Sequence, residues 1–98
     1  MSRNRDRNIV LTTLCLHALR TIQLNKPENL VLWNLATNLA PAGDVISNAE
    51  LGRELSVDTA HITRAMKRLC ELGFLMRGPK VGVSYHYKLN PAYFRIIS

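Results

Sequence analysis

Acidic residues are scarce in the second half of this 98-residue sequence. From residue 59 to residue 98 the only carboxylate side chain is that of Glu71, while the same segment carries seven Lys and Arg residues. Residues 1–58 balance six basic against six acidic residues, so the whole formal charge of +6 belongs to the second segment. Such an excess is typical of a protein that binds an anionic partner or is kept soluble by its charge. It also argues against paired catalytic carboxylates.

Cysteine is rare as well, because Cys15 and Cys70 stand alone without a C-x-x-C spacing. The histidines add no recognisable metal-ligand pattern to them, and "GPKVG" at 78–82 lacks the spacing of a phosphate loop. Neither a signal peptide nor an apolar run of membrane-spanning length is present. We therefore expect a cytoplasmic protein that is not an enzyme, with no catalytic residue, metal, cofactor or membrane partner.

The chain divides into a short arm and one small domain. Residues 1–8, "MSRNRDRN", predict a flexible basic arm, in which Arg3, Arg5 and Arg7 either enter a DNA minor groove or only solubilise the chain. Residues 9–98 are long enough for one core and predict a single domain. Its first element is an N-terminal helix over 9–24, since apolar residues recur there at helical spacing.

Three further helices follow from start and stop signals. Pro27 and Glu28 suit the first turn of a helix over 28–40, which the "APAG" segment ends. Ser47 and Glu50 have the spacing of a capping box and predict a short helix over 48–55. Asp58 is a good N-cap for the next helix, over 58–72, which Gly73 ends. Two helices joined by so tight a turn predict a helix-turn-helix.

The rest of the sequence predicts a β-hairpin over 74–89 around "GPKVG", followed by an apolar C-terminal tail over 90–98. In its second strand Val83, Tyr85, Tyr87 and Leu89 alternate with polar residues, as in a half-buried strand. Tyr85, Tyr87 and Tyr93 could act as DNA-cleaving nucleophiles, but alternation places the first two on the apolar face, which favours packing. The fold class is therefore mainly α with a small β-hairpin (α+β), a helix-turn-helix with a wing and an extra N-terminal helix.

The helix over 58–72 has two unlike sides. Ile62, Met66 and Leu69 share one side, while the opposite side is polar and basic. Any surface helix has a polar side, but a capped short helix, a tight turn and a hairpin with basic residues near its tip accompany this one. The residues predicted to contact DNA are Thr59, Ala60, His61, Thr63, Arg64, Lys67, Arg68, Arg77 and Lys80. Arg64 is expected to pair with guanine, and Lys67 and Arg68 to hold phosphates.

The segment "NAELGRELSVDTAHITRAMKRLCELGFLMR" resembles the winged helix-turn-helix of bacterial regulators and replication proteins. The ending "SYHYKLNPAYF" resembles the RepL-type replication proteins of plasmids and phages. The resemblance implies a bacterial protein that binds double-stranded DNA, either in plasmid or phage replication and maintenance or as a transcriptional repressor. We further expect a homodimer formed through the N-terminal helix. The alternative is a winged-helix module that binds a protein partner through its apolar ends.

Overall fold

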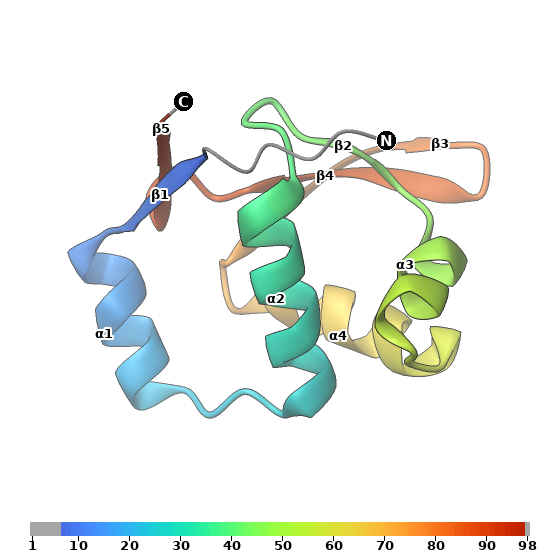
Figure 1. The fold of residues 1–98 in the computed structure, drawn as a ribbon, viewed down its shortest axis with the longest axis horizontal. Helices are drawn as coiled ribbons and strands as arrows, with labels where there is room; N and C mark the ends of the chain where they lie inside the picture. Colours follow the sequence, from blue (N-terminus) through green and yellow to red (C-terminus); the bar gives the residue numbers. More distant parts are fainter. Residues whose placement is uncertain (1–6, 98) are drawn as a thin grey trace.

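The computed structural model describes residues 7–97, which form four helices and five strands (Figure 1). In chain order they are β1 (Asn8–Leu11), α1 (Thr13–Thr21), α2 (Lys26–Asn38), β2 (Asp44–Ile46), α3 (Asn48–Leu55), α4 (Thr59–Glu71), β3 (Leu75–Val81), β4 (Ser84–Leu89) and β5 (Phe94–Ile97). The expected α+β class is confirmed. None of the helices in the described part is long and apolar enough to cross a membrane.

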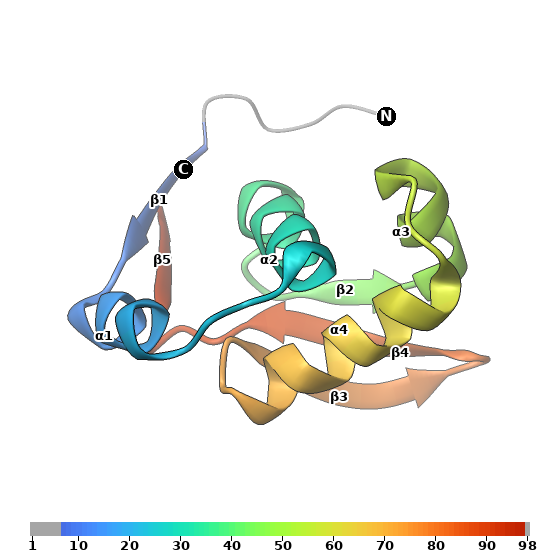
Figure 2. The same cartoon turned by 90° about the horizontal axis from the view of Figure 1, so that it is seen from below.

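The core lies where α2 and α4 pack together over the three-stranded sheet. Its largest fully buried side chains are Phe74, Leu32, Ile62, Met66, Leu69, Val31 and Cys15. The sheet has the order β2-β4-β3 and is antiparallel throughout. Figure 2 shows this sheet on one side, with α2 and α3 on the other. The helices predicted at 28–40, 48–55 and 58–72 are therefore all present, within about two residues of the expected bounds.

The first turn of α2 begins earlier than expected because Asn25 caps it. The Asn25 Oδ1 atom accepts a hydrogen bond from the Glu28 N–H at 2.9 Å, and the Glu28 Oε1 atom accepts one from the Asn25 N–H at 2.9 Å. This is a full capping box. In α3 only half of the expected box forms: the Ser47 hydroxyl accepts from the Glu50 N–H at 3.2 Å. Asp58 is the N-cap residue of α4, without a capping side-chain hydrogen bond.

The prediction of one helix over 9–24 is wrong at both ends. Residues 8–11 form strand β1, and the helix begins only at Thr13 because the Thr12 hydroxyl caps it, accepting from the Cys15 N–H. Ile9 and Leu11 face inward while Asn8 and Val10 are exposed, which is the period of a strand. The helix ends at Thr21, with Ile22 already extended.

The C-terminal segment is a strand and not merely an apolar tail. Strand β5 pairs antiparallel with β1, from Asn8 with Ile97 to Leu11 with Phe94. Asn90 directs the chain there, because its amide donates to the Gly73 carbonyl at 2.8 Å and its Oδ1 accepts from the Ala92 N–H. The β1–β5 ribbon lies at the opposite end of the molecule from the β3–β4 hairpin turn (Figure 1).

The hairpin turns later than the "GPKVG" segment suggested. Strand β3 runs to Val81, and the chain reverses at Gly82 and Val83, where Gly82 has φ +65°. Gly78 and Pro79 lie inside β3, where the register with β4 shifts between Arg77 and Lys80. Val83 is therefore at the tip and 95% exposed, so the expectation that it lies on the packed face is wrong.

Candidate nucleic-acid interface

Helices α3 and α4 are joined by a turn of three residues, Ser56 to Asp58. Ser56 has the left-handed conformation (φ 57°), which reverses the chain, and the Val57 N–H donates to the Gly52 carbonyl at 2.8 Å. Helix α3 approaches the backbone of this turn so closely that a Cβ atom on Gly52 would lie 2.6 Å from the Val57 carbonyl oxygen. A glycine is needed here by the approach of two backbones.

Helix α4 has the two sides that its sequence predicted. Ile62, Ala65, Met66 and Leu69 are buried in the core. The predicted contact residues Thr59, Ala60, His61, Thr63, Arg64 and Lys67 are all exposed. An exposed helix side of small, hydroxyl and basic residues has the width and chemistry to enter a major groove.

Short contacts order some of these exposed side chains. The Arg64 guanidinium and the His61 Nδ1 atom lie 2.8 Å apart, so the imidazole accepts from Arg64 when that nitrogen is unprotonated. The Asn48 amide donates to the Thr63 hydroxyl at 3.3 Å, and this hydroxyl donates to the Thr59 carbonyl at 3.0 Å. The N-terminal end of α3 therefore supports the exposed side of α4.

Two basic residues of β3 lie over the ring of one tyrosine. The Arg77 guanidinium carbon lies 4.5 Å from the centre of the Tyr85 ring, and the Lys80 Nζ atom lies 5.9 Å from it. Both distances are in the range of cation–π interactions. The Tyr85 ring therefore holds the positive charges of Arg77 and Lys80 close to each other on the hairpin.

An open cleft of about 850 Å³ lies between the helices and the hairpin. It runs between α4, the N-terminal end of α3 and the hairpin, and its lining includes Asn48, Thr59, Thr63, Lys67, Arg77 and Tyr85. Predicted contact residues from α4 and from the hairpin therefore line one concave surface.

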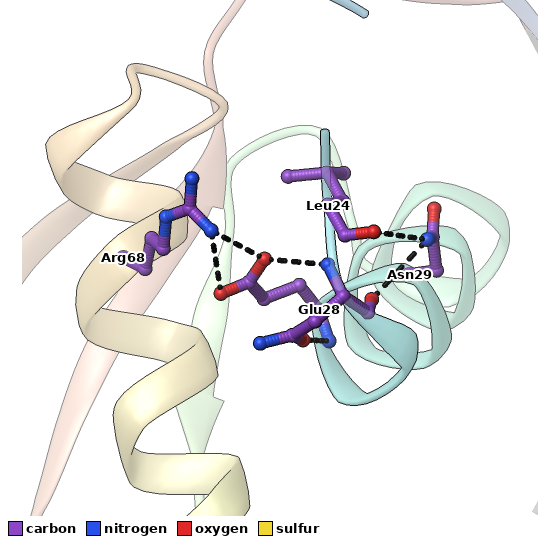
Figure 3. A network of polar contacts seen from close by, with 5 residues as sticks. Leu24, Glu28, Asn29 and Arg68 are labelled. Atoms are coloured by element: carbon purple, nitrogen blue, oxygen red, sulfur yellow. Dashed lines mark hydrogen bonds and ion pairs between the residues drawn. The ribbon is translucent and has the colours of Figure 1, made fainter. Parts of the chain in front are cut away.

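Arg68 points elsewhere. Its Nη1 atom donates to both carboxylate oxygens of Glu28, at 3.0 and 3.2 Å (Figure 3). Glu28 is buried, with 3% of its surface exposed, whereas the Arg68 side chain is 41% exposed. The structure therefore joins Arg68 to α2 and does not bring it into the cleft that Lys67 lines.

Comparison with solved structures identifies this architecture. The chain is similar to the DNA-binding TubR fragment from Clostridium botulinum, with 22% identity over 72% of this chain and 89% of that one and a TM-score of 0.56. It is also similar to Lactococcus lactis ZitR in complex with DNA, with 20% identity over 82% of this chain and 50% of that one and a TM-score of 0.52. The fold is a winged helix-turn-helix. No protein-family model and no curated protein sequence matches the chain.

Within this winged-helix fold, α4 is the second helix of the helix-turn-helix and the β3–β4 hairpin is the wing. All nine predicted contact residues lie on these two elements, and eight of them are exposed, whereas Arg68 is half-buried and bonded to Glu28. Of the arginines predicted in the arm, Arg3 and Arg5 lie outside the described residues. Arg7 is described, and burial of its guanidinium lowers its pKa.

Sequence reasoning missed three residues that shape the site. The alternation of β4 favours packing for Tyr85, yet its ring contacts Arg77 and Lys80; the only signal in the sequence is its place in a hairpin, where it pairs with Lys80. Asn48 follows the N-cap of α3 and gave no signal of its contact with Thr63. Glu28 was interpreted only as a favourable charge in the first turn of α2, and its pairing with Arg68 depends on tertiary packing.

Two titratable groups with shifted pKa values, the Cys70 thiol and the Tyr87 hydroxyl, line the cleft. Burial raises the pKa of the Cys70 thiol, an effect that the nearby charge of Arg77 partly offsets. Burial likewise raises the pKa of the Tyr87 hydroxyl. The charged residues on the cleft lining are Lys67 and Arg77, which are basic, and Glu71, which is acidic. Among residues 7–97 no group of three His, Cys, Asp or Glu side chains is arranged to hold a metal ion.

Proposed function

We propose that this protein binds double-stranded DNA in a sequence-specific manner, with α4 in the major groove and the wing against the adjacent backbone or minor groove. The observation that carries the proposal is the cleft between α4 and the wing, which Lys67 lines from the helix and Arg77 from the hairpin. DNA binding by the TubR fragment and by ZitR, which share the fold, supports the same function here.

The side chains of α4 are suited to different parts of the duplex. Thr59, Ala60 and Thr63 are short enough for close approach to base edges and thymine methyl groups. Arg64 reads a guanine with its guanidinium, which His61 orients through the 2.8 Å contact. Lys67 holds a phosphate, as do Arg77 and Lys80 on the wing.

The protein acts as a dimer in this proposal. Leu14 and Leu16 on α1 are 61% and 51% exposed and, being two residues apart, point to different sides of the helix, so each side offers one apolar side chain to a partner. They support association through the N-terminal helix. A two-fold pair of recognition helices would then meet half-sites about one helical turn apart. The biological role of such a dimer is transcriptional regulation or the replication and maintenance of a plasmid or phage, the second role being that of the RepL-type proteins it resembles.

Selection of bound duplexes from a random-sequence pool tests this function. We expect enrichment of a site with two-fold symmetry, which can then be sought in the DNA around the gene. Sites in the promoter of the gene would favour a repressor, and repeated sites in a replication origin would favour the replication role. A pool without any enriched sequence would contradict the proposal and favour a protein-binding module.

A further inference from the structure

The network around Glu28 ties α4 to α2 at a buried point. The Glu28 carboxylate accepts from Arg68 through both oxygens, and its Oε1 atom also accepts from the Asn25 N–H (Figure 3). It has little freedom to move, because the capping box fixes it to the first turn of α2 and the helix is anchored in the core by Val31 and Leu32.

This ion pair makes Arg68 unsuited to a phosphate contact. To reach DNA its guanidinium would have to leave a carboxylate that is almost fully buried, and an unpaired buried charge is strongly unfavourable. Among residues 7–97, Lys67 and Arg64 form no ion pair with a carboxylate. Of the three basic residues of α4, Arg68 is therefore the one already engaged within the protein.

The position of Arg68 on α4 allows the Glu28–Arg68 pair to restrain the rotation of this helix about its axis. The apolar side of α4 rests on the core through Ile62, Met66 and Leu69, and apolar contacts are not directional. Arg68 lies on the flank between this side and the exposed side, and its hydrogen bonds to a fixed carboxylate do have a direction. The pair therefore opposes rotation of α4 about its own axis, a rotation that would displace Arg64 and Lys67.

We infer that Glu28 and Arg68 are a positioning pair that sets the rotation of the recognition helix and so determines DNA sequence specificity without contacting DNA. The inference rests on the proposed function. It assigns a specificity role to Glu28, a residue of α2 that lies 40 positions before Arg68.

The variant Glu28→Gln is expected to change DNA affinity in opposite directions, depending on whether Arg68 positions α4 or holds a phosphate. Glutamine has the same shape and retains an oxygen for the capping box, but it loses the charge that holds the guanidinium. If the pair positions α4, E28Q weakens binding to the selected site by about tenfold, while binding to random duplex changes little. If Arg68 instead holds a phosphate, E28Q frees it and removes a negative charge, so binding to every duplex becomes tighter; that result would overturn the inference.

The double variant E28Q/R68M provides a second measurement, because removing both charges avoids a buried unpaired carboxylate. We expect the ratio of specific to non-specific affinity to fall as in E28Q, with the slope of log K against log salt as in the wild type. A slope reduced by about one, the contribution of one lost phosphate contact, would overturn the inference even if E28Q alone did not fold.

Glu54→Gln is the matched control. Glu54 is an exposed carboxylate of α3 that also contacts α2, by accepting from the Asn34 amide at 2.9 Å, and glutamine can still accept there. We expect E54Q to bind the selected duplex with the wild-type preference; an equal loss in E54Q would show that the change of charge and not the pair matters. A wild-type protein that binds no duplex would contradict the proposed function instead.

Discussion

Arg64 is exposed on α4 opposite the core residues, and its guanidinium contacts the His61 imidazole. A bidentate contact from such an arginine to guanine contributes about 1–3 kcal/mol of discrimination. We expect Arg64→Ala to weaken binding to the selected site by this amount and to relax the preference at one base pair. Competition binding with single-base variants of the site measures both effects. An unchanged preference at every position would remove Arg64 from base recognition.

Substitution of Gly52 tests how closely α3 packs against the turn of the helix-turn-helix. Glycine to alanine in a helix interior is ordinarily stabilising, by roughly 0.5–1 kcal/mol. Here the added Cβ would meet the backbone oxygen of Val57, so we expect Gly52→Ala to lower the free energy of unfolding by about 1–3 kcal/mol. Urea denaturation followed by circular dichroism measures the change.

Ser56→Gly is the comparison for this variant, because it lies in the same turn. Ser56 is the one non-glycine residue with a left-handed backbone among residues 7–97, and glycine adopts that conformation without a Cβ penalty. We expect Ser56→Gly to leave the stability unchanged or to raise it by up to about 1 kcal/mol. If Gly52→Ala proved stabilising, the close packing of α3 against the turn would be wrong.

The wing depends on Tyr85 to orient its two positive charges. Removal of the ring in Tyr85→Leu should weaken DNA binding by about two- to fivefold, since an exposed cation–π contact contributes roughly 0.5–1 kcal/mol. The salt dependence should stay the same, because Arg77 and Lys80 keep their charges. Tyr85→Phe keeps the ring and should bind as the wild type does. Titration of a fluorescent duplex distinguishes these outcomes, and an equal loss in both variants would assign the effect to the hydroxyl.

The helices and strands differ in how well the local sequence predicts them. Helices α2, α3 and α4 carry caps and an apolar side in the local sequence, so they could be predicted to within a few residues. The β1–β5 ribbon could not, because its pairing joins residues at opposite ends of the chain. Leu11 and Cys15 also continue a helical spacing, and only the Thr12 cap and its contact with Ala92 show where the helix starts.

The same difference between local and long-range contacts explains which features of the candidate site could be predicted. The burial of one side of α4 and the exposure of the other follow from helical periodicity alone. The partner of Arg68 was not, because a contact between residues 28 and 68 depends on the packing of α2 on α4. Local patterns therefore identify which side chains are exposed, and tertiary structure decides which of them are already engaged.

The two ends of the whole molecule differ in character. The wing carries basic residues, while the opposite end exposes Leu14 and Leu16. We expect sedimentation velocity to give twice the 11.1 kDa mass of the chain, and the double variant L14E/L16E to give the monomer. Val83→Glu is the control, because Val83 is a still more exposed apolar residue and lies on the wing, away from α1. A monomeric wild type would contradict association through α1.

Salt dependence of duplex binding tests most directly whether α4 and the wing form the DNA-binding surface. Each lost phosphate contact lowers the slope of log K against log salt by about one, so K67A/K80A should reduce it by about two. The control R20A/K26A removes two exposed charges from α1 and α2 and should retain the wild-type slope. Equal reductions in both variants, or a wild-type affinity that does not change with salt, would contradict the assignment of the DNA-binding surface to α4 and the wing.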